Sequence, residues 1–354
     1  MSAAEVAGRT PLLEVRQLVV THPLRTGPLG RAVKRVRAVD GVDLDVYEGE
    51  ALGLVGESGC GKTTLGRTIL RLIPADSGSI RFAGRDLLGA SRRELRQLRR
   101  EMQLVFQDPY SSLDSRATIG DSIAEGLRAH GVPSADRRRR VDEVLDLVGL
   151  DPSHARRFPH EFSGGQRQRV GIARALAVEP RFLVADEPVS ALDVSIRSQM
   201  LNLLADLRER LVLTMLFVAH DLSVVEHLCD RVAVMYLGRI VEVGTRNEVF
   251  GAPQHPYTRA LLAAVPVPDP SRRRQRALAG EAPSRVAPPS GCPFHLNCPI
   301  AVSGICDAEV PLLRSQDGHP GHVAACHLRT GDHQDLDPAP NPDSDRDTPG
   351  RPPG

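Results

Sequence analysis

The residues best suited to chemistry in this chain form a glycine-rich loop. The stretch GLVGESGCGKTTLGR carries Gly56, Gly61, Lys62 and Thr63 in the order G-x-x-x-x-G-K-[ST], with a further glycine at Gly59. An apolar run precedes the loop and a helix-compatible segment follows it, which is the context that a phosphate-binding loop requires. Glycines let backbone N–H groups approach phosphate oxygens, and a helix N-terminus favours negative charge. The spacing therefore predicts a nucleotide site made of Gly56, Glu57, Ser58, Gly59, Cys60, Gly61, Lys62, Thr63 and Thr64.

Metal binding and hydrolysis can be assigned to four side chains. Lys62 is expected to reach the β- and γ-phosphates, and the Thr63 hydroxyl to ligate Mg²⁺. A second apolar run, RFLVADEP, ends in Asp186 and Glu187. A carboxylate at the carboxyl end of a buried strand beside such a loop is placed to hold Mg²⁺, which suits Asp186. Glu187 would then face the attacking water as a general base.

A second anion site is predicted in the stretch HEFSGGQRQRVGIARALA. A helix is expected to begin at its glycine pair, with residues Ser163, Gly164, Gly165, Gln166, Arg167 and Arg169 in or near the first turns. Backbone N–H groups at such a helix start can bind an anion. The plainer interpretation is a capped helix in which Ser163 is the N-cap. A single nucleotide site would not need both the glycine-rich loop and this second anion site.

The elements that must position these residues alternate along the chain. Strand-like runs occur as ALGLV, MQLVF, RFLVAD, LTMLFVAH and RVAVMYL, and helical patterns follow Lys62, Ile119, Arg137, Gly165, Ser195 and Asp221. This alternation predicts an α/β fold with a mostly parallel sheet. Residues 111–162 show helical patterns without clear strands, which predicts a helical insertion.

Composition limits the classes of protein that remain. The chain has 354 residues, is 41% hydrophobic and has a formal net charge of +1, so no overall field favours nucleic acid. No run approaches the roughly 20 apolar residues of a membrane-spanning helix, and the first residues do not resemble a secretory signal. We therefore expect a cytosolic chain. Residues 266–290 have a linker composition, and residues 329–354 are expected to be disordered.

The motifs together resemble the ATP-binding subunits of ABC transporters. The phosphate loop, Gln107 in VFQDPYSSLD, the FSGGQ and DEP stretches, the SALD stretch (Ser190 to Asp193) and His220 occur in that order. The resemblance covers residues 12 to about 265 and implies an ABC-type P-loop fold with an antiparallel β part and a helical subdomain at about 111–165. In that family two such domains meet head to tail. The phosphate loop of one and the SGGQ stretch of the other enclose one ATP, which accounts for two anion sites.

The resemblance also assigns roles to further residues. It implies that Gln107 contacts Mg²⁺ or the water, that Asp193 lies at the dimer seam, and that His220 touches the γ-phosphate and helps Glu187 hold the attacking water. The aromatic residue that stacks on adenine in this family is replaced here by His22 in LVVTHPL.

Longer stretches are similar to the ATPases of bacterial oligopeptide and dipeptide importers, particularly the second of their two unlike ATPases. They include DEPVSALDVSIRSQMLNLL and HPYTRALLAAVP. The resemblance implies a heterodimer with a sister ATPase, two membrane permeases and an extracytoplasmic solute-binding protein, at the cytoplasmic face of the membrane and without nucleic acid. Importers of nickel, glutathione or oligosaccharides use ATPases of the same type, so these solutes remain alternatives for the cargo. A soluble ABC ATPase acting on nucleic acid or the ribosome is the rival class.

Four late cysteines form a pattern of their own. Residues 291–328 are predicted to be a small Cys-rich extension in which the spacing is C-x5-C-x7-C-x19-C, at Cys292, Cys298, Cys306 and Cys326. A cytosolic chain keeps its thiols reduced, so we expect no disulfides. Four thiolates can hold an iron–sulfur cluster or zinc. The resemblance favours a [4Fe–4S] cluster, with zinc or free thiols as alternatives.

Overall fold

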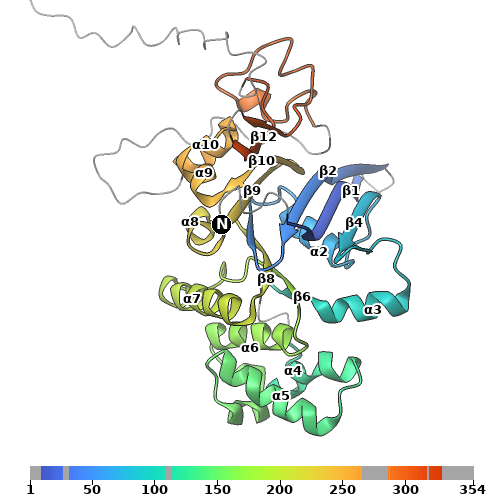
Figure 1. Cartoon of the computed structure of the whole chain (residues 1–354), viewed down its shortest axis with the longest axis vertical. Helices are drawn as coiled ribbons and strands as arrows, with labels where there is room; N and C mark the ends of the chain where they lie inside the picture. Colours follow the sequence, from blue (N-terminus) through green and yellow to red (C-terminus); the bar gives the residue numbers. More distant parts are fainter. Residues whose placement is uncertain are drawn as a thin grey trace, which may run out of the picture.

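The computed structural model describes residues 9–26, 32–108, 113–264, 286, 288–316 and 319–328. Their strands form two sheets (Figure 1), one of eight strands in the order β11-β12-β10-β9-β3-β8-β7-β6 and one of four in the order β2-β1-β4-β5. The predicted linker, 266–290, lies outside the described residues except for Val286 and 288–290. The predicted disordered tail, 329–354, lies entirely outside them.

The centre of the larger sheet is parallel. Its parallel-paired strands are β6 (Met102–Val105), β7 (Phe182–Asp186), β8 (Thr214–Ala219), β3 (Ala51–Val55) and β9 (Arg231–Tyr236). Antiparallel strands continue it on one side: β10 (Arg239–Thr245), β12 (His319–Ala324) and β11 (Arg314–Gln316). The predicted mostly parallel sheet is confirmed. Its strands are short continuous apolar runs because they are buried on both faces.

The smaller sheet is the antiparallel β part of the fold. It consists of β1 (Pro11–Thr26), β2 (Ala32–Tyr47), β4 (Ser77–Phe82) and β5 (Arg85–Asp86). Alternate residues of β3 show how the two sheets share a core. Leu52 and Leu54 pack into an apolar cluster with the smaller sheet, whereas Ala51 and Val55 belong to a second cluster with the helices on the other face. This alternation follows from the two-residue repeat of a strand.

Helices surround the larger sheet. They are α2 (Lys62–Ile69), α3 (Arg92–Glu101), α4 (Ile119–Ala129), α5 (Ser134–Leu147), α6 (Gly164–Leu176), α7 (Val194–Leu211), α8 (Leu222–Leu228), α9 (Arg246–Gly251) and α10 (Pro256–Ala263). Figure 1 shows α4 and α5 at one end of the long axis and α9, α10 and β12 toward the other. Short 3-10 turns at Pro152–Arg156, Pro159–Glu161 and His295–Asn297 complete the described elements. None of the helices in the described ranges is long and apolar enough to cross a membrane.

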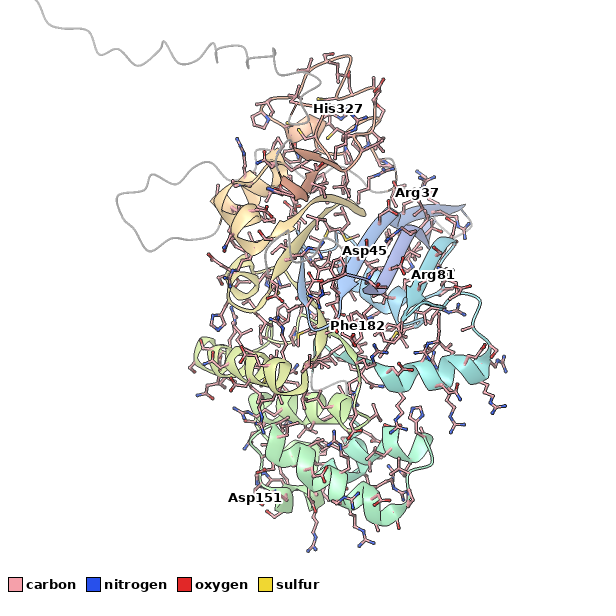
Figure 2. The ribbon with its side chains drawn as sticks, viewed as in Figure 1. Arg37, Asp45, Arg81, Asp151, Phe182 and His327 are labelled. Atoms are coloured by element: carbon pink, nitrogen blue, oxygen red, sulfur yellow. The ribbon has the colours of Figure 1, made fainter. Side chains whose placement is uncertain are left out.

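The late Cys-rich residues are continuous with the main sheet. Strand β12 pairs with β10 through Glu242 opposite Ala324 and Val243 opposite Val323, and β11 pairs with β12. Figure 2 places His327 at this end of the molecule and Asp151 at the opposite end. The Cys-rich residues therefore share backbone hydrogen bonds with the sheet that carries the glycine-rich loop.

Candidate functional site

The glycine-rich loop joins β3 to α2 and is confined on both sides. Gly56 has φ +153° and Gly61 has φ +115°, conformations that residues with a side chain rarely adopt. A Cβ atom at Gly56 would lie 2.1 Å from the Met235 carbonyl oxygen, and one at Gly61 would lie 2.0 Å from the Ala38 carbonyl oxygen. Glycine is therefore required at both positions, which leaves the backbone of the loop free to face a ligand.

Lys62 is buried at the start of α2, with only 4% of its surface exposed. Its ammonium donates hydrogen bonds to the carbonyl oxygens of Gly56 at 2.7 Å and Glu57 at 2.9 Å. The N-cap of α2, Gly61, supplies no side-chain hydrogen bond to the first turn. The N–H groups of that turn and the Lys62 ammonium thus form a positively polarised pocket suited to phosphate.

Thr63 and Asp186 meet as a metal site would require. The Thr63 hydroxyl donates to Asp186 Oδ1 at 2.8 Å, and Arg67 Nη2 lies 3.5 Å from Oδ2. Burial raises the pKa of the Asp186 carboxyl, although the Thr63 hydrogen bond and the Arg67 charge oppose that shift. A buried carboxylate beside a hydroxyl offers two oxygen ligands of the kind that Mg²⁺ prefers.

Three side chains converge where parallel strands end. Gln107 follows β6, Glu187 follows β7 and His220 follows β8, and these strands are neighbours in the sheet. Gln107 Nε2 donates to Glu187 Oε2 at 3.2 Å, and His220 Nδ1 lies 3.1 Å from the same oxygen. The carboxyl ends of adjacent parallel strands share one edge, which is why residues distant in sequence meet there. The sequence predicted all three residues, and the structure brings them together.

Glu187 is held in a strained backbone conformation. Its φ is +46°, in the left-handed region that glycine normally occupies. Its N–H donates to the Val218 carbonyl oxygen at 3.0 Å, and its own carbonyl oxygen accepts hydrogen bonds from the Ser190 N–H and hydroxyl. Backbone strain of this kind persists only where the surroundings fix it, and it is concentrated at active sites.

The predicted adenine-stacking residue lies beside the loop helix. His22, on β1, places Nε2 3.4 Å from the Thr64 hydroxyl and is exposed. Asp193 is exposed at the N-cap of α7, and its side chain does not cap the helix. Both positions leave the side chain open to a ligand or a partner.

The SGGQ stretch begins α6 with a complete capping box. The Ser163 hydroxyl accepts from the Gln166 N–H, and the Gln166 side chain accepts from the Ser163 N–H. Arg167 and Arg169, predicted near this helix start, donate instead to the carbonyl oxygens of Pro159 and Val148. Ser163 remains exposed, and Figure 1 shows α6 well separated from α2 along the long axis. The capped helix is thus present, and it lies apart from α2, the helix that follows the chain's own loop (Figure 1).

A buried polar network fixes the start of α10. The Glu242 carboxylate accepts from the His255 backbone N–H at 2.8 Å and pairs with His322 Nε2 at 2.7 Å. His255 Nδ1 in turn accepts from the Tyr257 N–H at 3.1 Å, with Pro256 at the first helical position. Sequence analysis missed this network, although a histidine N-cap before proline is a recognisable helix start.

His255 should make the native state sensitive to acid. Burial lowers the pKa of its imidazole from 6.5 to about 4, although the nearby Glu242 carboxylate opposes that shift. The contribution of neutral His255 to the free energy of unfolding is fully present above pH 6.5. It is lost as the pH drops to about 4, by at most about 1.4 kcal/mol per pH unit. Hydrogen bonds from His322 and its neighbours lower the pKa of Glu242 against the effect of burial, which adds acid sensitivity at lower pH.

The variant His255→Asn separates the two contributions, because asparagine retains an acceptor for the Tyr257 N–H and does not titrate. Thermal unfolding at about pH 7 and about pH 5 should show a smaller loss of Tm for the variant than for the parent. Equal losses would show that His255 is not the group responsible.

The prediction of a metal site in the late cysteines is not supported. Within the described residues, no group of three or more His, Cys, Asp and Glu side chains is arranged to hold a metal ion. One small cavity is nevertheless lined by Cys292, Cys298, Cys306 and Cys326. Burial raises the pKa of the Cys292 thiol to about 12 and that of Cys298 to about 11, so both are protonated at neutral pH. Within the described residues the four cysteines therefore line one cavity without the arrangement that a metal site requires.

Two families match the chain. Residues 39–190 match the family described as ABC transporter, and residues 241–306 match the family described as oligopeptide/dipeptide transporter, C-terminal region. The first range contains the phosphate loop, Gln107, the SGGQ stretch and Glu187. The second contains His255, Tyr257 and the first three late cysteines.

Curated relatives match almost the full length. A putative peptide import ATP-binding protein of Brucella ovis is 53% identical over 319 residues, covering 90% of this chain and 98% of its own. The oligopeptide transport ATP-binding protein AppF of Bacillus subtilis is 49% identical, covering 91% of this chain and 98% of its own. OppF of Salmonella typhimurium, also named an oligopeptide transport ATP-binding protein, is 48% identical with the same coverages.

Solved structures share the fold. CbiO1 of Clostridium perfringens, described as part of the ABC transporter complex cbiONQ, is 30% identical with a TM-score of 0.59 and covers 68% of this chain and 91% of its own. The ATP-binding cassette MJ0796, in a dimeric post-hydrolysis state with ADP and Pi, is 28% identical with a TM-score of 0.58 and covers 66% of this chain and 98% of its own.

Proposed function

This chain belongs to the ATP-binding proteins of ABC transporters, in the branch that carries the oligopeptide/dipeptide C-terminal region, and we propose that it hydrolyses ATP to power peptide import. The observation that supports hydrolysis is the meeting of Gln107, Glu187 and His220 at the edge that also carries the phosphate loop. Peptide as cargo is supported by the names of its relatives. None of the three relatives named above is named for nickel, glutathione or an oligosaccharide.

Each residue at the sheet edge has a proposed part in the reaction. The loop backbone and Lys62 bind the β- and γ-phosphates, and Thr63, Asp186 and Gln107 hold Mg²⁺, which neutralises phosphate charge when bound. Glu187 accepts a proton from the attacking water, and Gln107 and His220, which both contact its Oε2, hold the carboxylate in place. His220, half exposed, orients the water and the γ-phosphate. His22 stacks on the adenine.

A second ATPase is needed to complete the site. Ser163 is exposed, and the capped start of α6 belongs to a helix that lies apart from α2 and the chain's own loop (Figure 1), so we assign this helix start to ATP held by a partner. The dimeric state of the relative MJ0796 supports such an arrangement. In this proposal a sister ATPase supplies the SGGQ stretch that closes this chain's loop, with Asp193 at the seam.

The remaining partners follow from the transporter family. Two permease subunits would cross the membrane, a solute-binding protein would deliver peptide from outside, and the ATPase pair would lie against the cytoplasmic face. Affinity purification of the tagged chain from detergent-solubilised membranes tests this directly. We expect two polytopic membrane proteins and one further ATPase to co-purify. Association that is lost on nuclease treatment would favour the rival class, an ATPase acting on nucleic acid or the ribosome.

For the cysteine cavity we propose a [4Fe–4S] cluster, with Zn²⁺ as the alternative, held by Cys292, Cys298, Cys306 and Cys326. The convergence of four thiols on one cavity supports this, although the thiols would have to lose their protons and rearrange to bind. Iron and zinc analysis of anaerobically purified protein is the test. Iron with visible absorbance supports the cluster, and colourless protein containing neither metal leaves four free thiols.

A further inference from the structure

The hydroxyl of Tyr257 lies against the phosphate loop. Tyr257 belongs to α10, two hundred residues beyond the loop in sequence, and its side chain is completely buried. The Glu57 N–H donates a hydrogen bond to the Tyr257 hydroxyl oxygen at 3.0 Å. Burial raises the pKa of this phenol, so the hydroxyl stays neutral and acts as an acceptor. Tyr257, on the helix α10, thus contacts the backbone of the loop that is proposed to bind phosphate.

Glu57 is the loop residue that also restrains Lys62. Its carbonyl oxygen accepts from the Lys62 ammonium at 2.9 Å and from the Cys60 N–H at 3.1 Å. The carbonyl group of Glu57 therefore accepts a hydrogen bond from Lys62, and the N–H of Glu57 donates one to Tyr257. The Lys62 ammonium has three donors and can turn toward a phosphate when one binds, whereas the Glu57 N–H is directed at the Tyr257 hydroxyl. Tyr257 can therefore keep its hydrogen bond to the Glu57 N–H while the Lys62 ammonium turns toward a phosphate.

Tyr257 is itself held by its surroundings. Its ring centroid lies 4.5 Å from that of Tyr236 on β9 and 5.6 Å from that of Phe294 in the Cys-rich residues. Its N–H is fixed by His255, whose own position is set by the buried Glu242. Because the ring, the backbone and the helix start are all fixed, the hydroxyl is presented to the loop in one orientation.

We propose that Tyr257 is a positioning residue for ATP hydrolysis, acting through Glu57 to keep the loop in the shape that receives phosphate. The inference rests on the ATPase function. Glycines allow the loop backbone to approach a phosphate closely. They also allow the free loop to adopt many other backbone conformations. Without the tyrosine hydroxyl the free loop would sample other shapes, and ATP would have to restore the binding shape at the expense of affinity.

The variant Tyr257→Phe removes the hydroxyl and keeps the ring. We expect KM for ATP to rise about tenfold, because the Glu57 N–H loses its partner, while kcat changes much less. Amide hydrogen exchange of the loop peptide should be faster in the free variant than in the free parent. The difference in hydrolysis rate between variant and parent should shrink at saturating ATP, whereas a loss of folded protein would lower the rate at every ATP concentration.

Tyr236→Phe is the matched control. It removes a hydroxyl from the same aromatic cluster, and within the described residues that hydroxyl makes no hydrogen bond to the loop. It should leave KM and loop exchange at the parental level. If Tyr257→Phe shows parental KM and parental loop exchange, the positioning role is wrong. A parent protein that does not hydrolyse ATP at all would instead overturn the proposed function.

Discussion

Exchanging Glu187 for glutamine should abolish ATP turnover and leave ATP binding close to the parental level. The variant keeps the size of the side chain and an oxygen that Gln107 and His220 can still contact, but it cannot accept a proton from water. Loss of a general base typically lowers the rate by about a hundredfold to ten-thousandfold. Steady-state ATPase assays of the purified transporter, paired with nucleotide-binding measurements, separate the two effects. Bound ATP should accumulate, with the ATPase pair held closed.

The control for this variant is Glu226→Gln. Glu226 is an exposed carboxylate on α8, the helix that follows His220, so the same substitution is made close to the site but outside it. It should hydrolyse ATP at the parental rate. Glu187→Gln at the parental rate would show that another group activates the water.

Replacing Lys62 with alanine should remove most of the affinity for ATP. The ammonium is buried, and it donates to two loop carbonyl oxygens and lies 3.9 Å from the Cys60 sulfur. A phosphate offers this ammonium an acceptor that itself carries negative charge, which makes a stronger hydrogen bond than a neutral carbonyl oxygen does. Loss of such a contact corresponds to a weakening of about a hundredfold. Equilibrium binding of a fluorescent ATP analogue measures it.

The sequence supplies an unusual control for this second variant. Lys62 and Lys34 are the only lysines in the chain, and Lys34 is exposed on β2. Lys34→Ala should bind ATP like the parent. The same pair allows a chemical test, in which an amine-reactive reagent labels both lysines and ATP protects Lys62 alone. Equal affinity in the two alanine variants would remove Lys62 from the phosphate site.

Sequence reasoning located the hydrolytic residues because strand ends are visible in sequence. Gln107, Glu187 and His220 each follow a short apolar run, and parallel strands bring such positions to one edge. Thr63 and Asp186 could be paired on the same reasoning. The positive φ of Glu187 was not visible, since nothing in the residue type requires it.

The contacts that were missed join distant segments. The bond between Tyr257 and Glu57 depends on how α10 packs after the antiparallel strands, and the HPY stretch carries no local signal of that partner. The pairing of β12 with β10 was equally invisible, because the Cys-rich residues show weak strand patterns after a segment of linker composition. Cysteine spacing predicted a metal site, whereas burial left at least two of these thiols protonated.

The two arginines near the SGGQ stretch donate hydrogen bonds within the chain. Arg167 and Arg169 follow the SGGQ stretch in the first turns of α6. In the folded chain they donate to the carbonyl oxygens of Pro159, which begins a 3-10 turn, and of Val148, at the end of α5. The side chains of Arg167 and Arg169 therefore connect the first turns of α6 to neighbouring backbone segments.

The central claim is that this chain's SGGQ stretch completes the ATP site of another ATPase. The most direct measurement is a structure of the Glu187→Gln transporter, closed with ATP, at a resolution that shows the γ-phosphates. Ser163 and the Gly165 N–H should lie within about 3 Å of a γ-phosphate oxygen on the nucleotide bound by the partner's loop. A closed, ATP-loaded assembly in which Ser163 faces no phosphate across the subunit boundary would contradict the account.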